Sequence, residues 1–94
     1  GEPLGCGGVR QLEPGIAEVK HMWLSPKLRG RGLGRGLLSA LEQWGHDLGA
    51  TLVRLDTSPH LPEAVALYRA VGYTEIPQYN DHDLDALWFE RPLP

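Results

Sequence analysis

Residues 17–38 read AEVKHMWLSPKLRGRGLGRGLL, and this stretch decides the fold because it carries the signals for three successive elements. Its first part, residues 17–24, has the period-two alternation of a strand. One side of this strand would hold Val19, His21 and Trp23, and the other Glu18, Lys20, Met22 and Leu24. Pro26 ends the strand, since proline cannot donate to a ladder. A glycine-rich turn follows, and helical spacing of apolar residues begins at Gly34.

A strand, a glycine-rich turn and a helix N-terminus in this order predict an anion site. Free backbone N–H groups and the positive end of the helix dipole point the same way there, and glycines let the backbone approach a ligand. Four of the chain's nine basic residues also lie in this stretch, namely Lys27, Arg29, Arg31 and Arg35. The expected ligand is a small anion such as a pyrophosphate.

Two common nucleotide motifs do not fit the turn. No Gly-x-x-x-x-Gly-Lys-Ser/Thr sequence occurs in it, which excludes a Walker A loop. The dinucleotide pattern Gly-x-Gly-x-x-Gly fails from every starting glycine, because Arg35, Leu37 or Ser39 stands where the last glycine is required. The turn therefore needs another explanation.

Periodicity and turn signals predict the elements on either side of this stretch. The predicted strands cover residues 4–12, 17–24, 51–57, 73–76 and 86–90, and the predicted helices cover residues 34–48 and 62–71. The first helix is expected to bury Leu37, Leu38, Leu41, Trp44 and Leu48, and the second Ala64, Leu67, Tyr68 and Val71. Gly72 suits the left-handed position that ends the second helix. The helix between strands 17–24 and 51–57 makes a β-α-β unit, whose strands should be parallel.

The turn matches the signature Arg/Gln-x-x-Gly-x-Gly/Ala through Arg29, Gly32 and Gly34, and so resembles GNAT-superfamily N-acetyltransferases. The AEV of the preceding strand and the sequence PEAVALYRAVGY at residues 62–73 resemble further family features, and the resemblance extends from Gly5 to Glu90. It implies an α/β (α+β) fold with a mixed twisted sheet, order β-β-α-β-α-β and two helices packed on it.

The resemblance also implies a function. The chain would move an acetyl group from acetyl-CoA to a primary amine by direct attack in a ternary complex. A non-catalytic acetyl-CoA or acyl-CoA-binding module is the alternative, and an interaction domain that binds a phosphorylated partner is a more distant one.

Coenzyme binding is expected along the second strand and the turn. The family likeness assigns the pyrophosphate to the backbone amides of residues 31–35 and the pantetheine to the end of the second strand, whose N–H at Trp23 or Leu24 would bind the oxyanion. The full predicted set is Met22, Trp23, Leu24, Arg29, Gly30, Arg31, Gly32, Leu33, Gly34 and Arg35. A plain exposed turn stays open as an alternative, and so does simple solvation of Arg31 and Arg35. Leu61 replaces an asparagine that many family members carry before the second helix.

Acetyl transfer needs a base for the amine and an acid for the departing thiolate. Tyr68, in the Leu-Tyr pair of the family, is the expected acid, or else a core aromatic. Glu18 is the expected base, acting through water, or else a strand carboxylate paired with Lys20. His21 is a further candidate base by residue type, but it belongs to the opposite face of the strand.

Composition limits the remaining possibilities. A net charge of −3 argues against general binding to nucleic acid or membranes. A lone cysteine, Cys6, with no signal peptide favours the cytoplasm. The four histidines and Cys6 lack the paired spacing that is typical of metal ligands. Residues 81–85 are expected to form a solvated loop, so no metal site is predicted.

The 94 residues fit a single domain over residues 1–94. The N-terminal strand and helices of a complete GNAT domain are not recognisable in it. We therefore expect a fragment, a short member, or half of an assembly such as a homodimer. The acceptor would be a small-molecule or peptide amine, and an aminoglycoside, polyamine, amino acid or protein N-terminus all remain open.

Overall fold

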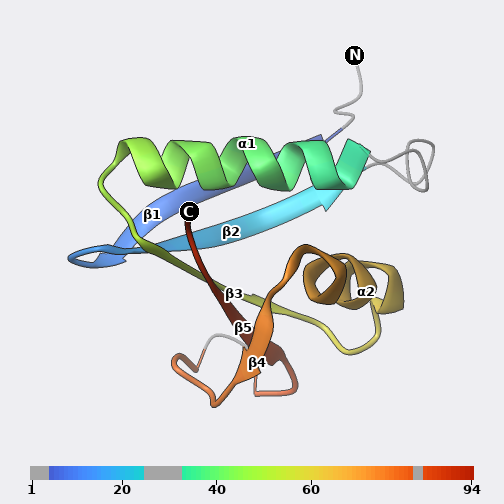
Figure 1. Ribbon diagram of the computed structural model, residues 1–94. Coiled ribbons are helices and arrows are strands. Elements are labelled where there is room, and N and C mark those ends of the chain that lie inside the picture. Colours follow the sequence, from blue (N-terminus) through green and yellow to red (C-terminus); the bar gives the residue numbers. More distant parts are fainter. Residues whose placement is uncertain (1–4, 25–32, 82–83) are drawn as a thin grey trace.

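The computed structural model describes residues 5–24, 33–81 and 84–94. Its strands are β1 (Gly5–Glu13), β2 (Ile16–Leu24), β3 (Leu52–Thr57), β4 (Thr74–Ile76) and β5 (Leu87–Pro92), and its helices are α1 (Leu33–Asp47) and α2 (Pro62–Val71) (Figure 1). The predicted order β-β-α-β-α-β is confirmed, and β5 follows it where residues 86–90 predicted a last strand. Among the described residues, no helix is both long and apolar enough to cross a lipid bilayer.

One mixed sheet forms the centre of the molecule, with strand order β1-β2-β3-β5-β4. The hairpin of β1 and β2 is antiparallel, β2 and β3 are parallel, and β5 is antiparallel to both of its neighbours. The parallel pair confirms the β-α-β unit that the sequence predicted.

Both helices contribute to one hydrophobic cluster on one face of this sheet. The cluster contains Val19, Leu38, Leu41, Val53, Leu55, Tyr68, Tyr73 and Phe89. Because strand side chains alternate, the neighbouring residues Glu18, Arg54 and Asp56 belong to the opposite face. The sheet therefore has one apolar face under the helices and one polar face.

The buried face of α1 differs from the expected one. Leu38 and Leu41 are buried as predicted, but Trp44 and Leu48 are 49% and 55% exposed, so their predicted burial is wrong. Gly45 occupies the buried position instead, and a Cβ added there would lie 3.1 Å from the Cβ of Ala17. Since glycine lacks a side chain, α1 approaches the sheet closely at this point, and a search for apolar spacing overlooks it.

The second helix follows its sequence signals. Pro62 stands in its first turn, where a missing N–H costs nothing. Gly72 ends it at φ 110°, in the left-handed region that favours glycine. Tyr68 is buried, and Ala64, Leu67 and Val71 pack against the cluster as predicted.

Candidate active site

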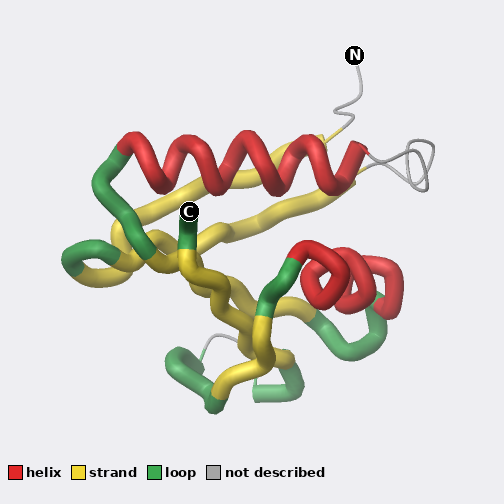
Figure 2. The backbone as a smooth tube through the Cα atoms, viewed as in Figure 1, coloured by secondary structure: helices red, strands yellow, loops and turns green. Residues whose placement is uncertain are grey.

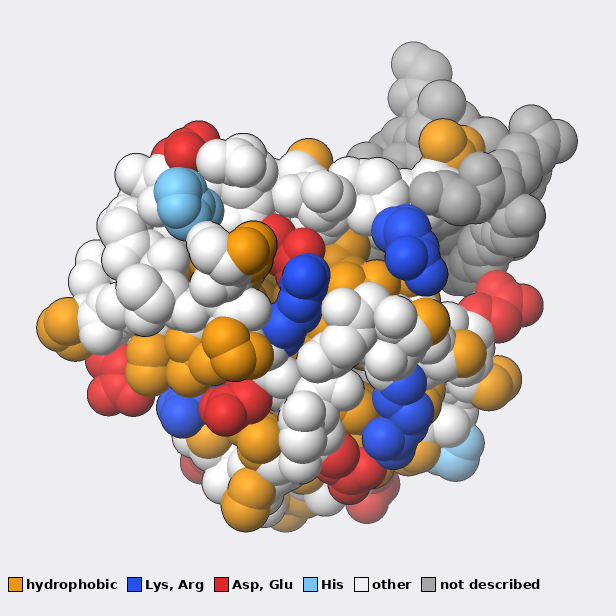
Figure 3. All heavy atoms as spheres, viewed as in Figure 1, with side chains coloured by type: hydrophobic (Ala, Val, Ile, Leu, Met, Phe, Trp, Pro, Cys, Tyr) orange, Lys and Arg blue, Asp and Glu red, His pale blue; other side chains and the backbone are white. Residues whose placement is uncertain are grey.

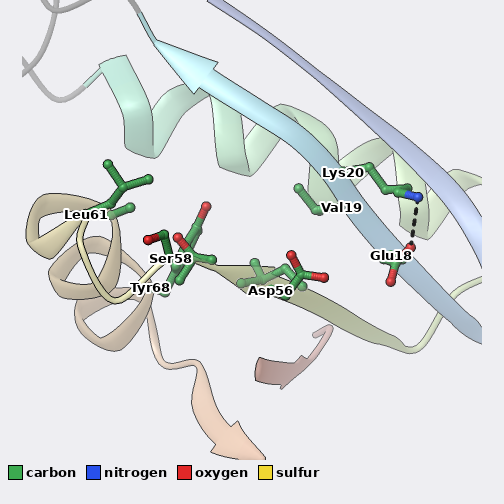
Figure 4. A pocket seen from close by; sticks show the side chains of 10 residues that line it. Glu18, Val19, Lys20, Asp56, Ser58, Leu61 and Tyr68 are labelled. Carbon is green, nitrogen blue, oxygen red and sulfur yellow. Dashed lines mark ion pairs between the residues drawn. The ribbon is translucent and has the colours of Figure 1, made fainter. Parts of the chain in front are cut away.

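The main feature of the candidate site is a gap between strands β2 and β3 of the sheet. The two strands pair only from Ile16 to Glu18 on β2 and from Leu52 to Arg54 on β3. Beyond this point β2 runs toward the start of α1 while β3 runs toward α2, so the strands diverge (Figure 2). A cleft of about 220 Å³ opens between them. Residues 18–20 and 55–58 line it together with Leu61, Ala64 and Tyr68 (Figure 4).

Tyr68 reaches the cleft from the helix side. It is only 5% exposed, and its ring lies 5.7 Å from that of Tyr73 and 6.2 Å from that of Phe89, centroid to centroid. Burial, together with the negative charge of Asp56, raises the pKa of Tyr68 to about 12. The phenol is thus protonated at neutral pH, and it both packs in the core and borders the cleft.

Glu18 lies on the polar face of β2 and is 2% exposed. Its Oε1 accepts a hydrogen bond from Arg10 Nε at 2.8 Å, and Lys20 Nζ lies 3.8 Å from the same oxygen. Burial alone would raise the pKa of Glu18, but hydrogen bonds from Arg10 and Tyr79 and the charges of Arg10 and Lys20 outweigh it and lower the pKa. The predicted ion pair with Lys20 is present, and a carboxylate held ionised in this way is a weak base.

Two residues of the loop after β4, which the sequence did not pair with Glu18, complete this network. The Tyr79 hydroxyl donates to Glu18 Oε2 at 2.8 Å. Asn80 Nδ2 donates to the same oxygen at 3.3 Å and to Asp56 Oδ2 at 3.0 Å. Asn80 Oδ1 in turn accepts from Trp88 Nε1 at 2.9 Å. Since an indole N–H can only donate, Trp88 sets the orientation of the Asn80 amide.

The loop carrying Tyr79 is also held by Arg54, whose guanidinium lies 5.6 Å from the centroid of the Tyr79 ring. Burial raises the pKa of Tyr79, and its hydrogen bond to the ionised Glu18 raises it further. Tyr79 therefore donates to Glu18 throughout the ordinary pH range. Asp56, a polar residue near the end of β3, could have indicated a site from the sequence. Nothing in the sequence indicated, however, that Asp56 contacts Asn80, which lies 24 residues further along the chain.

The predicted coenzyme residues fall into three groups. Arg29, Gly30, Arg31 and Gly32 lie outside the described residues. Leu33, Gly34 and Arg35 form the first turn of α1, which contains no acidic residue. Met22, Trp23 and Leu24 form the end of β2, beyond its pairing with β3. Because successive N–H groups of a strand point to opposite edges, only one of Trp23 and Leu24 can donate into the gap.

Leu61 stands at the N-cap of α2, where its apolar side chain makes no capping hydrogen bond. It is 48% exposed and lines the cleft. The side-chain contact that an asparagine would offer at this position is thus absent from the cleft wall.

The short parallel pairing of β2 with β3 and the tyrosine at the cleft between them agree with the fold that the sequence of residues 17–38 implies. The acetyltransferase (GNAT) family model matches residues 1–73, more than half of the chain. The chain therefore belongs to the GNAT acetyltransferase family, and the resemblance inferred from the sequence is confirmed.

Individual relatives agree with this family. An IAA acetyltransferase of Azospirillum brasilense is 32% identical over 99% of the chain, which spans 63% of that protein. A crystal structure from Klebsiella pneumoniae, described as an acyl-CoA N-acyltransferase, is 35% identical and superposes with a TM-score of 0.89. The match covers 99% of this chain and 66% of the Klebsiella chain. A Bacillus anthracis structure with acetyl coenzyme A shares the fold, at 17% identity and a TM-score of 0.81. This match covers 97% of the present chain and 57% of the Bacillus chain. The chain thus spans about two thirds or less of these relatives.

Proposed function

We propose that this chain is the catalytic core of an N-acetyltransferase that transfers an acetyl group from acetyl-CoA to a primary amine within a ternary complex. The observation that supports this most is the gap between β2 and β3, which has a protonated tyrosine on one side and carboxylates on the other. Membership of the GNAT family supports acetyl-CoA as the donor.

The coenzyme would bind along the edge of β2 and at the start of α1. In this proposal the pantetheine lies against the unpaired edge of β2 at residues 22–24, and the pyrophosphate meets the turn before α1. The first turn of α1 has no acidic side chain to offset the positive end of its dipole. Backbone N–H groups, rather than arginine side chains, would carry most of the binding.

The reaction would proceed by direct attack. The neutral amine nitrogen forms a bond to the thioester carbonyl carbon, the C–S bond breaks, and the thiolate leaves. Tyr68 would donate a hydrogen bond to the sulfur. Full proton transfer from a phenol with a pKa of about 12 to a thiolate is uphill, because an alkyl thiol such as that of cysteine has a pKa of about 8.5. We infer that Tyr68 releases its proton only as the positive charge of the attacking amine develops beside it.

The experiment compares wild type with Tyr68→Phe, which keeps the ring and removes the hydroxyl. Isothermal calorimetry measures acetyl-CoA binding, and release of CoA thiol is followed with spermidine, kanamycin, an amino acid and a peptide with a free N-terminus. We expect turnover with at least one amine and a loss of about 100-fold in Tyr68→Phe with unchanged coenzyme affinity. Coenzyme binding without thiol release from any amine would favour the non-catalytic acyl-CoA-binding module.

Three further expectations belong to this proposal. The first is that the 94 residues act as one GNAT-like domain in the cytoplasm. The second is that the partner is a small-molecule or peptide amine rather than nucleic acid or a membrane. The third is that two copies of the chain associate. On the face shown in Figure 3, acidic and basic side chains are interspersed, which supports the second. Native mass measured with and without acetyl-CoA tests the third, and a monomer under both conditions would contradict it.

A further inference from the structure

Tyr73 follows Gly72 at the end of α2, and it contacts Tyr68 in two ways. Its backbone N–H donates to the carbonyl oxygen of Tyr68 at 2.9 Å. Its ring lies 5.7 Å from the ring of Tyr68, centroid to centroid, and the two planes are tilted by 59°. A tilted pair is a favourable arrangement of aromatic rings. Tyr73 therefore contacts both the backbone and the ring of the residue that would act as the acid.

The hydroxyl of Tyr73 reaches the other helix. It donates to Oε2 of Glu42, in the middle of α1, at 2.7 Å. Tyr73 is 4% exposed and Glu42 is 8% exposed, so this hydrogen bond is buried. Burial raises the pKa of Tyr73, and the hydrogen bond to Glu42 raises it further, so the hydroxyl stays protonated and donates throughout the ordinary pH range. A single side chain thus connects α1 to Tyr68 of α2.

Arg91, on β5, completes the attachment of Glu42. Its Nη1 lies 3.1 Å from Oε1 and 3.0 Å from Oε2 of Glu42, so the buried carboxylate has a positive partner. A buried ion pair adds little net stability, because removing both charges from water costs about as much as their mutual attraction contributes. An apolar pair would hold α1 on the sheet equally well, but directed hydrogen bonds fix the distance between two groups more closely. The arrangement therefore favours a role in geometry over a role in stability.

The distance between α1 and α2 matters for the proposed reaction, because the coenzyme would touch both. Helix α1 packs along β1 and β2, and α2 follows β3 on the other side of the gap (Figure 1). In the proposed function the pyrophosphate meets the turn before α1, while the thioester sulfur lies beside Tyr68. A shift of either helix would change the distance from this sulfur to the Tyr68 hydroxyl, and a misplacement of about 1 Å can slow a positioned reaction by about 100-fold.

From these contacts we propose that Tyr73 is a positioning residue for the reaction: bound to Glu42 of α1, it holds Tyr68 at a fixed distance from the start of that helix, where the coenzyme would bind. This inference rests on the proposed function. Tyr73 is not among the described residues that line the cleft, so it would not touch the reacting atoms. Its effect on the reaction would act through the Tyr68 hydroxyl alone.

The test measures amine-dependent thiol release for wild type, Tyr73→Phe, Tyr68→Phe and the double variant in the full chain, using the best amine of the panel above. Tyr73→Phe keeps the ring and removes the hydroxyl that binds Glu42. We expect its kcat to fall by about tenfold, with KM for the amine and acetyl-CoA affinity unchanged. In the Tyr68→Phe background the same change should have no further effect, because the hydroxyl that Tyr73 positions is then absent. A purely structural role would lower turnover by the same factor in both backgrounds.

Two further variants separate positioning from a loss of stability. Glu42→Gln removes the charge that binds Arg91 and weakens the hydrogen bond from Tyr73, so we expect kcat to fall again, and again only when the Tyr68 hydroxyl is present. Val9, on β1, packs against the same hydrophobic cluster but does not line the cleft. Val9→Ala should therefore lower Tm while kcat stays at the wild-type value.

The outcomes distinguish the inference from the proposed function. Wild-type kcat in folded Tyr73→Phe, or an equal loss in both backgrounds, would overturn the inference while leaving the proposed function intact, and so would a matching fall of kcat in Val9→Ala. Absence of turnover in wild type would instead refute the proposed function, and this inference with it. If Tyr73→Phe does not fold, Glu42→Gln decides by the same comparison of the two backgrounds.

Discussion

Replacing Glu18 by glutamine should destabilise the protein, because the amide cannot accept every hydrogen bond that the carboxylate accepts. In the structure Glu18 accepts from Arg10, Tyr79 and Asn80. Glutamine has one acceptor oxygen, and its NH₂ group would face a donor from the loop. Arg10 is more than half exposed and is re-solvated at little cost. The main loss is a buried donor without an acceptor, which costs about 2 kcal/mol.

Thermal unfolding measures this loss. For a chain of this size about 2 kcal/mol lowers Tm by roughly 10 °C. The pH dependence provides a second readout. Because the pKa of Glu18 is lowered in the folded state, its stabilisation is fully present above the unfolded value of about 4.3 and is lost as the pH falls through the folded pKa. The difference between wild type and Glu18→Gln should therefore be constant from pH 6 to 8 and shrink below about pH 4.

Two controls sharpen the result. Glu90→Gln, on the same face of the sheet, should cost no more than about 1 kcal/mol because its partner Arg54 remains partly solvated. A double-mutant cycle of Glu18→Gln with Tyr79→Phe should show a coupling of about 1 kcal/mol, since the two groups share one hydrogen bond. A Glu18→Gln protein that melts within 2 °C of wild type, taking about 2 °C as the smallest meaningful change, would refute the view that Glu18 anchors the loop after β4.

Three other changes test separate parts of the structure. Gly45→Val should cost about 1–3 kcal/mol in chemical denaturation, because its Cβ would lie 3.1 Å from that of Ala17 on the sheet, and unchanged stability would contradict the close packing of α1. Leu61→Asn should raise stability by about 1 kcal/mol in the same assay, since asparagine can cap α2 where leucine cannot, and a loss would show that the backbone there does not suit a cap. Gly34→Val should weaken acetyl-CoA binding in calorimetry far more than Arg35→Ala does, and equal small losses would refute binding by the backbone.

The element boundaries show what local signals can predict. Strand β2, helix α2 and its ending at Gly72 lie within a residue or two of the predicted positions, because alternation, proline and glycine act within a few residues. The face of α1 was predicted less well. The apolar spacing alone predicted that Trp44 and Leu48 are buried, whereas in the structure the buried face of α1 is the one that carries Gly45.

The residues of the site also differ in whether local sequence signals could predict them. Tyr68 and Glu18 were identified from the strand and helix that carry them, and both border the cleft. Asn80 and Tyr79 were missed as partners of Glu18, since 62 and 61 residues separate them from it. No periodicity extends across such a distance, and a polar loop has the same composition whether it points to water or folds over a sheet.

The sequence by itself therefore determined the types and order of the elements, the parallel β-α-β unit and the family, all of which depend on patterns within a continuous segment. The tertiary structure alone decided where β2 and β3 part, which face of α1 is buried, and that Asn80 joins Glu18 to Asp56. Those features depend on how separate segments pack in space, because a hydrogen bond forms only between groups that folding has already brought within reach.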